Sequence, residues 1–168
     1  MHTNNLIYLL ALICLLGFGA CKKEGLNPLS DFRPDIPVTV SNVFDYRPNP
    51  TVKASKADDK ITITLQIPAN SGRTIKEISK VAAATTANFT PIQTATTVST
   101  NGLYSNTPIP GNGTSVTFET SFTEYKTKTA TTTNPASNAL LTRAFYFMIT
   151  LDNGETILPQ FVRVWVVD

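Results

Sequence analysis

Residues 143–167 read RAFYFMITLDNGETILPQFVRVWVV and hold two runs of β-branched and aromatic residues, the types that favour strands. Between the runs lies Asn153-Gly154, the preferred pair for a two-residue hairpin loop, because both residues of a type I′ turn need a positive φ. This stretch therefore predicts an antiparallel β-hairpin.

The register of this hairpin decides which side chains are buried. With Asn153-Gly154 as the loop, Ile149 lies opposite Leu158, and Phe145 lies opposite Val162. The face that these residues share is expected to be core, and its members are Phe145, Phe147, Ile149, Leu151, Leu158, Val162, Val164 and Val166. Pro159-Gln160 interrupts this face and predicts a bulge or an edge, because proline lacks the amide hydrogen that a strand ladder needs.

The opposite face of the hairpin carries a candidate binding surface, made of Tyr146, Phe161, Arg163 and Trp165. Tyr, Trp and Arg are favoured anchors at interfaces, so an exposed patch of them would stack on sugars or dock a protein. Tyr104, in the segment 85–113, is a second candidate for ligand contact. The alternative is that long loops cover the hairpin face and that Tyr104 pins its own loop to the domain.

Further strands are predicted upstream of the hairpin. Residues 60–68 alternate most clearly, with an apolar side made of Ile61, Ile63, Leu65 and Ile67. Residues 115–125 repeat this design, with an apolar side made of Val116, Phe118 and Phe122. Residues 38–44 and 51–54 are shorter candidates, the second suited to a sheet edge, and residues 72–86 are predicted as a strand from their β-branched content.

Two long connections separate these strands. Residues 85–113 have no sustained period and contain Pro91, Asn101-Gly102 and Gly111-x-Gly113, so they predict a long loop with one short strand or helical turn. A loop of that length in a compact domain is often functional. Residues 126–137 form a second, Thr-rich connection, and the chain shows no repeat and no long amphipathic helix.

About seven short strands, each with one apolar face, predict an all-β, antiparallel β-sandwich over residues 38–168. The number and pattern of strands resemble an immunoglobulin-like or fibronectin type III-like domain. The Cys-Trp-Cys signature of antibody domains is absent, and Trp165 lies on the last predicted strand. The resemblance therefore concerns the architecture rather than a particular subfamily.

The first residues of the sequence carry a second resemblance. Residues 6–18 are almost wholly apolar, Gly19-Ala20 supply small residues, and Cys21 follows them, a pattern that resembles the lipobox of bacterial lipoproteins. The resemblance implies that residues 1–20 are a removed signal peptide and that Cys21 carries diacylglycerol and an amide-linked acyl chain such as palmitate. Residues 21–37, rich in proline, would then be a flexible linker. The alternative is an ordinary secretory signal that is cut nearby.

Charged residues follow Cys21 directly, at Lys22-Lys23-Glu24, and resemble the surface-export signal of Bacteroidota-type lipoproteins. The resemblance implies a lipid-anchored position in the outer membrane, on the cell surface or the periplasmic face. Surface lipoproteins of that type often belong to polysaccharide-uptake systems, so a glycan or an envelope protein is the expected partner, beside the membrane itself.

The inventory of reactive side chains excludes several classes of function. The single histidine, His2, and one of the two cysteines, Cys14, lie in the segment predicted to be removed. The remaining chain therefore lacks a Ser-His-Asp triad, a Cys-His pair and the usual zinc ligands, and we expect neither a metal nor a cofactor. The formal net charge is +2 and the basic residues are scattered, which argues against a nucleic-acid partner.

Carboxylate chemistry is the one catalytic alternative. A glycoside hydrolase needs two acids about 5 to 9 Å apart in a cleft, and the candidates are Asp58, Asp59, Glu77, Glu119 and Glu124. Their places in a predicted turn and on a solvated strand face favour a role as surface charges. The sequence thus predicts a non-catalytic binding or accessory module, with a carboxylate-dependent hydrolase or a purely structural envelope subunit as alternatives.

Overall fold

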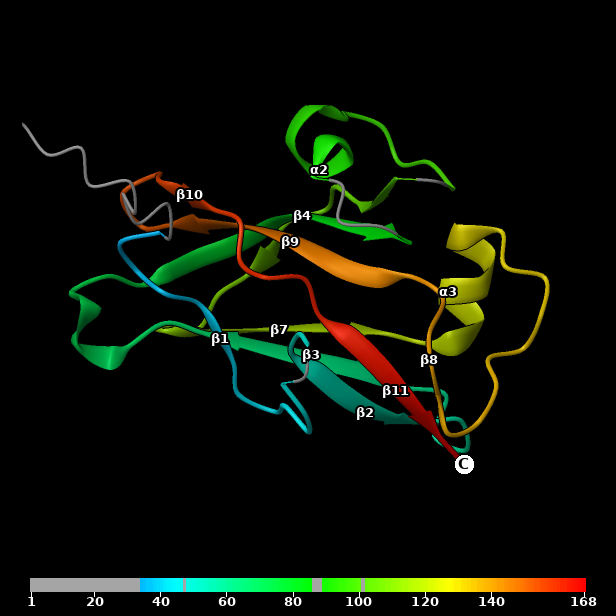
Figure 1. The fold of residues 1–168 in the computed structure, drawn as a ribbon. Helices are drawn as coiled ribbons and strands as arrows, with labels where there is room; N and C mark the ends of the chain where they lie inside the picture. Colours follow the sequence, from blue (N-terminus) through cyan, green and yellow to red (C-terminus); the bar gives the residue numbers. More distant parts are fainter. Residues whose placement is uncertain (1–33, 47, 86–88, 101) are drawn as a thin grey trace, which may run out of the picture. The chain divides into compact units, whose positions relative to one another are not determined.

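The structure, a computed structural model, describes residues 34–46, 48–85, 89–100 and 102–168 (Figure 1). The predictions for the signal peptide 1–20, for Cys21 and for most of the linker 21–37 lie outside the described residues. The strands are β1 (Thr39–Val40), β2 (Thr51–Ser55), β3 (Ile61–Gln66), β4 (Ile75–Ala84), β5 (Leu103–Ser105), β6 (Ile109–Pro110), β7 (Ser115–Thr120), β8 (Ala139–Leu140), β9 (Ala144–Leu151), β10 (Thr156–Ile157) and β11 (Arg163–Val167). The helices are the 3₁₀ turn η1 (Ala69–Ser71), α2 (Thr90–Thr94) and α3 (Phe122–Thr129).

The predicted all-β sandwich is confirmed. One sheet has the strand order β10-β9-β4-β5, with β6 also paired to β4, and two smaller sheets have the orders β1-β3-β7 and β2-β11-β8. In Figure 1, β4 and β9 form one layer, and β1, β3, β7, β2 and β11 lie on the other side of the core. The strand pairs are antiparallel with one exception, β2 with β11, which is parallel.

The core lies between these layers and draws on each of the three sheets, for example through Val52 in β2, Ile63 in β3 and Phe147 in β9. The alternation predicted for residues 60–68 is confirmed, since Ile61, Ile63, Leu65 and Ile67 are all buried. The predicted strands at 72–86 and at 51–54 are also present, as β4 and β2, and β2 lies at the edge of its sheet as expected.

The predicted hairpin register is wrong by one residue between β9 and β10. Ile157, rather than Leu158, pairs with Ile149. The Leu151 N–H donates to the Glu155 carbonyl at 2.9 Å, which leaves a three-residue loop in which Gly154 has a φ of 85°. A type I turn followed by a glycine in the left-handed region is the usual form of such a loop.

Beyond β10 the chain leaves this hairpin and enters the other layer. The interruption expected at Pro159-Gln160 is confirmed, because the strand stops after Ile157 and resumes at Arg163. The predicted pair Phe145–Val162 is confirmed as an isolated bridge, with N–H to carbonyl distances of 2.9 and 2.8 Å. β11 then pairs with β2 and β8 instead of β9.

The strand predicted at 115–125 is too long, because β7 ends at Thr120 and α3 follows. Ser121 caps this helix, since its Oγ accepts from the Glu124 N–H at 2.9 Å. Ser-x-x-Glu is the spacing of a capping box, and this signal competes with the strand alternation. Phe122 and Tyr125 are buried, so α3 closes one end of the core.

Candidate functional site

The structure divides the predicted binding surface, and it buries Tyr146. This side chain is 2 % exposed and belongs to a small second cluster on the outer side of β4 and β9. The Phe89 ring meets the Tyr146 ring edge-on, with centroids 5.4 Å apart, and Ile92 of α2 is buried in the same cluster. The expectation that Tyr146 is exposed is therefore wrong, because the segment that contains α2 folds over this face, as the alternative proposed.

Tyr104 is buried as well, and the expectation that it lies on a loop is wrong. It belongs to β5 and is 2 % exposed, with its ring edge-on to Phe145 and Phe118 at centroid distances of 5.5 and 6.0 Å. The Tyr104 hydroxyl lies 2.6 Å from the Thr120 Oγ1. Tyr104 is thus a core residue.

Phe161 and Arg163 line a surface pocket of about 190 Å³, together with Tyr146. The Phe161 and Tyr146 rings lie 5.2 Å apart, with planes inclined at 36°, and form an apolar wall. The pocket is also lined by polar, uncharged side chains, namely Asn49, Thr85 and Thr142. Three of the four residues predicted for the hairpin face are therefore brought together at one pocket.

Arg163 supplies the charge of this pocket. Its backbone N–H donates to the Pro50 carbonyl at 2.8 Å, and it stands opposite Thr51 in the parallel pairing of β11 with β2. Within the described part of the chain, no ion pair and no side-chain hydrogen bond reaches the Arg163 guanidinium. No acidic residue lines the pocket among the described residues.

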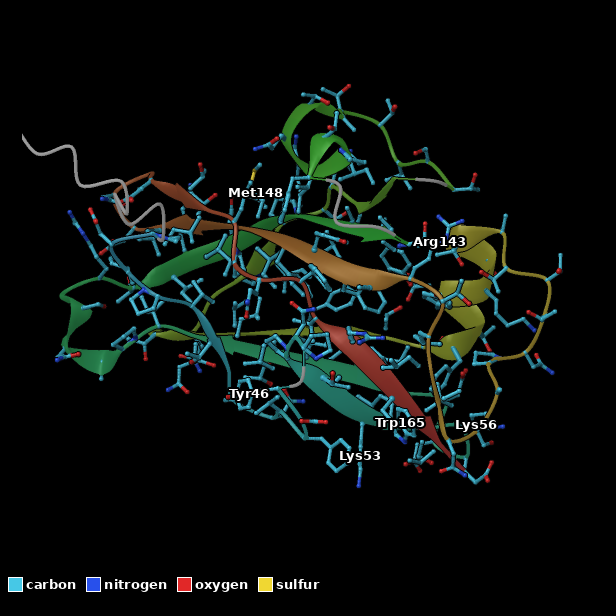
Figure 2. The ribbon with its side chains drawn as sticks, in the orientation of Figure 1. Tyr46, Lys53, Lys56, Arg143, Met148 and Trp165 are labelled. Carbon is cyan, nitrogen blue, oxygen red and sulfur yellow. The ribbon has the colours of Figure 1, made fainter. Side chains whose placement is uncertain are left out.

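Trp165 lies outside the pocket, on the outer face of β11, where it is partly exposed. It stands in register with Lys53 of β2 and with Leu140 of β8. The Lys53 ammonium lies 3.8 Å from the centroid of the Phe44 ring. In Figure 2, Lys53 and Trp165 lie on the β2–β11 layer, on the opposite side of the view from Met148.

Phe44 and Tyr46 complete a surface that sequence reasoning missed. Their side chains are 54 % and 58 % exposed, and they lie in the segment between β1 and β2. We call Phe44, Tyr46, Lys53 and Trp165 the aromatic face. A signal for it is present in the sequence, because the two aromatic residues run into Arg47-Pro48-Asn49-Pro50, where prolines prevent a strand from continuing.

The pocket and the aromatic face are neighbours. Arg163 and Trp165 are alternate residues of β11 and point to the same side, about 7 Å apart along the strand. Val164, between them, points inward and is fully buried. One strand thus carries both the charged residue of the pocket, Arg163, and one ring of the aromatic face, Trp165.

The carboxylates proposed for catalysis are placed as surface charges. Asp58 and Asp59 are exposed, and Glu119 forms an ion pair with Lys60 at 2.7 Å. Glu124 lies 2.8 Å from the Lys128 ammonium, and this contact, with the Thr120 hydroxyl, lowers the pKa of its carboxyl. A general acid needs the opposite shift.

Two further pockets lie beside α3, and neither brings two carboxylates together. One, of about 210 Å³, is lined by Tyr125, Asn134 and Pro135 without a carboxylate, and the other, of about 260 Å³, has Asp59 as its single acidic residue. Among the described residues, no group of three or more His, Cys, Asp or Glu side chains is placed to hold a metal ion. The remaining candidate carboxylate of the hydrolase hypothesis, Glu77, lies on β4 opposite Pro110.

Within the same residues, no helix has the length and the apolar character needed to cross a bilayer. Comparisons of this chain with models of known protein families, with curated proteins and with solved structures give no significant match.

Proposed function

We propose that this chain is a non-catalytic binding module of the bacterial outer membrane, anchored by lipid on Cys21, and that its ligand is a glycan. The observation that carries the proposal is the aromatic face. Phe44 and Tyr46 are more than half exposed, although burying such a side chain is worth roughly 1.5–3 kcal/mol. Aromatic rings held in solvent supply contact area at a low cost in side-chain entropy.

The chemistry of this surface favours a sugar over a flat protein partner. A sugar ring has an apolar C–H face and a rim of hydroxyl groups, and it matches aromatic rings that are flanked by hydrogen-bond donors. Trp165 lies beside Lys53 of the neighbouring strand β2, and Arg163 is the preceding outward-facing residue on β11 itself. This arrangement of a few polar groups around apolar contact area is typical of small-molecule sites.

The placement of the acids supports binding rather than catalysis. The described carboxylates of the hydrolase hypothesis are exposed, ion-paired or on separate elements, and the pocket beside Arg163 is lined by neutral groups. A hydrolase needs a proton donor and a nucleophile at the bound bond. The Arg163 pocket has groups that hold a ligand, not groups that move its protons.

The binding half of the proposal is tested with the purified full-length chain in detergent on a glycan array. We expect a defined set of glycans to bind, and Tyr46→Ala and Trp165→Ala to reduce that binding at least tenfold. Val98→Ala is the matched control, because Val98 is an exposed apolar residue outside the aromatic face. Binding that survives both aromatic substitutions would overturn the proposal, and so would an array without any bound glycan.

The anchoring half is tested separately in cells. We expect radiolabelled palmitate to enter the wild-type chain and not Cys21→Ser, and mass spectrometry to find an acylated Cys21 at the mature N-terminus. A mature N-terminus without lipid contradicts the anchor and leaves the binding surface unaffected. Digestion of intact cells with protease distinguishes the cell surface from the periplasmic face.

A further inference from the structure

The Arg163 pocket contains a positive charge that the fold itself does not neutralise. Lys56, Lys60, Arg73 and Lys128 each lie within 4.0 Å of a carboxylate oxygen. Arg163 has no such partner among the described residues, although its side chain is partly withdrawn from solvent. A guanidinium in this position is a strong site for a carboxylate, because its planar fork matches both oxygens of that group.

The rest of the lining is suited to the same group. Asn49 and Thr142 add neutral hydrogen-bonding side chains, and no described acidic residue lines the pocket to compete for the guanidinium. The partly buried Phe161 ring, which packs against the buried Tyr146 ring, supplies an apolar wall on which the carbon skeleton of a ligand can lie. A cation, neutral donors and an aromatic wall together favour an acidic group that is carried on a ring.

The size of the pocket limits what it holds. Its volume of about 190 Å³ is below the roughly 300–1,000 Å³ of sites that enclose drug-sized ligands. It therefore has room for one unit of a longer molecule. Trp165 is the next outward-facing residue after Arg163 on β11, so the next unit of the same molecule would reach the aromatic face.

We infer that the Arg163 pocket binds the carboxylate of an acidic sugar, so that the glycans recognised by this module contain uronic acids. The inference rests on the proposed function, because it assigns a chemical class to the same ligand. It adds a division of roles: the aromatic face binds sugar rings of any charge, and Arg163 selects the chains that carry carboxylates.

The test compares each acidic oligosaccharide with its own methyl ester, which keeps the sugar and removes the charge. The probes are oligogalacturonate and oligomannuronate, measured by calorimetry on the full-length chain in detergent. We expect the acid of at least one pair to bind about tenfold more tightly than its ester, as for a hydrogen bond to a charged group. Added salt should reduce this preference, because exposed charge pairs are screened.

Three substitutions assign the preference to Arg163. Arg163→Gln should bind the acid and the ester equally, with ester affinity unchanged, and Arg163→Lys should retain part of the preference, because it keeps the charge but loses the fork. Arg73→Gln is the control, since Arg73 is an exposed arginine near Asp152, outside the pocket. Thermal unfolding of each variant verifies that it is folded.

The outcomes separate the inference from the proposed function. Equal binding of acid and ester by the wild-type chain overturns the inference, and so does an acid preference that Arg163→Gln retains. In either case, glycan binding that depends on Trp165 still supports the proposed function. If the chain binds neither the probes nor any glycan on the array, the inference and the proposed function are both overturned.

Discussion

The Tyr104 hydroxyl lies 2.6 Å from the Thr120 Oγ1 and so links β5 to the last residue of β7 inside the core. Thr120 in turn donates to the Glu124 carboxylate at 2.8 Å, and Glu124 pairs with Lys128 at the same distance. The Lys128 ammonium lies 4.6 Å from the centroid of the Tyr104 ring, so the contacts among these four side chains form a closed ring. Burial raises the pKa of the Tyr104 hydroxyl far above its ordinary value. This network ties α3 to the sandwich.

Thr120→Val tests the network. Thr120 donates to Glu124 and accepts from Tyr104, so valine leaves the buried Tyr104 hydroxyl without its acceptor, at a cost of about 1–3 kcal/mol. Tyr104→Phe should cost less, because Thr120 keeps its bond to Glu124. Urea unfolding of the two variants checks this order. Equal losses, or a larger loss for Tyr104→Phe, would contradict the assigned direction of the bonds.

Glu124 gives the fold a dependence on acid pH. Its pKa in the folded chain is lowered from the ordinary 4.5, first by Lys128 and also by Thr120. A lowered pKa means that its contribution is complete well above pH 4.5 and is lost as the pH falls through the folded value. The stability difference between the wild type and Glu124→Gln should therefore be constant near neutrality and shrink below pH 4.5. Urea unfolding across this range measures it, and Lys128→Met should remove most of the effect.

Position 111 requires glycine because its backbone lies very close to a neighbouring strand, not because of its backbone angles. A Cβ at this position would lie 2.0 Å from the Ile75 carbonyl oxygen, which is part of β4 and cannot move easily. Gly111→Ala should therefore destabilise by more than about 3 kcal/mol. Gly72→Ala is the comparison, because its φ is 68° but the space around it is open, and it should cost only about 1–2 kcal/mol. Similar losses of denaturation midpoint in the two variants would contradict the close contact.

Local sequence patterns predicted the strands that bury one face. In β3, for example, apolar and polar residues alternate because one face of the strand packs on the core and the other faces solvent. They predicted the hairpin but not its register. The Asn153 side chain accepts from the Glu155 N–H at 3.1 Å, which helps to stabilise a three-residue loop in place of the two-residue turn. The same Asn-Gly pair fits both loops, so the sequence alone does not choose between them.

In the candidate site, too, local sequence patterns predicted which way side chains point but not what covers them. Periodicity correctly placed Arg163 and Trp165 on an outward face of β11, since their intervening residue is buried. It failed at Tyr146, because the cover over this residue comes from Phe89 and Ile92, more than fifty residues earlier in the chain. Whether an outward face meets water or a folded loop depends on tertiary contacts that no local pattern encodes.

Ile92 holds this cover in place and provides the last prediction. It is fully buried in the outer cluster, beside Ala82 and Tyr146, and α2 is only five residues long. Ile92→Ala should release the segment around α2 by local unfolding rather than unfold the sandwich, because the main core has separate residues. Hydrogen exchange should show faster exchange around α2 and unchanged protection in β3 and β7. Because Thr85 and Tyr146 also line the Arg163 pocket, the same variant should weaken binding of the acidic oligosaccharides. Uniform loss of protection across β3 and β7 would show instead that the cover and the sandwich unfold as one unit.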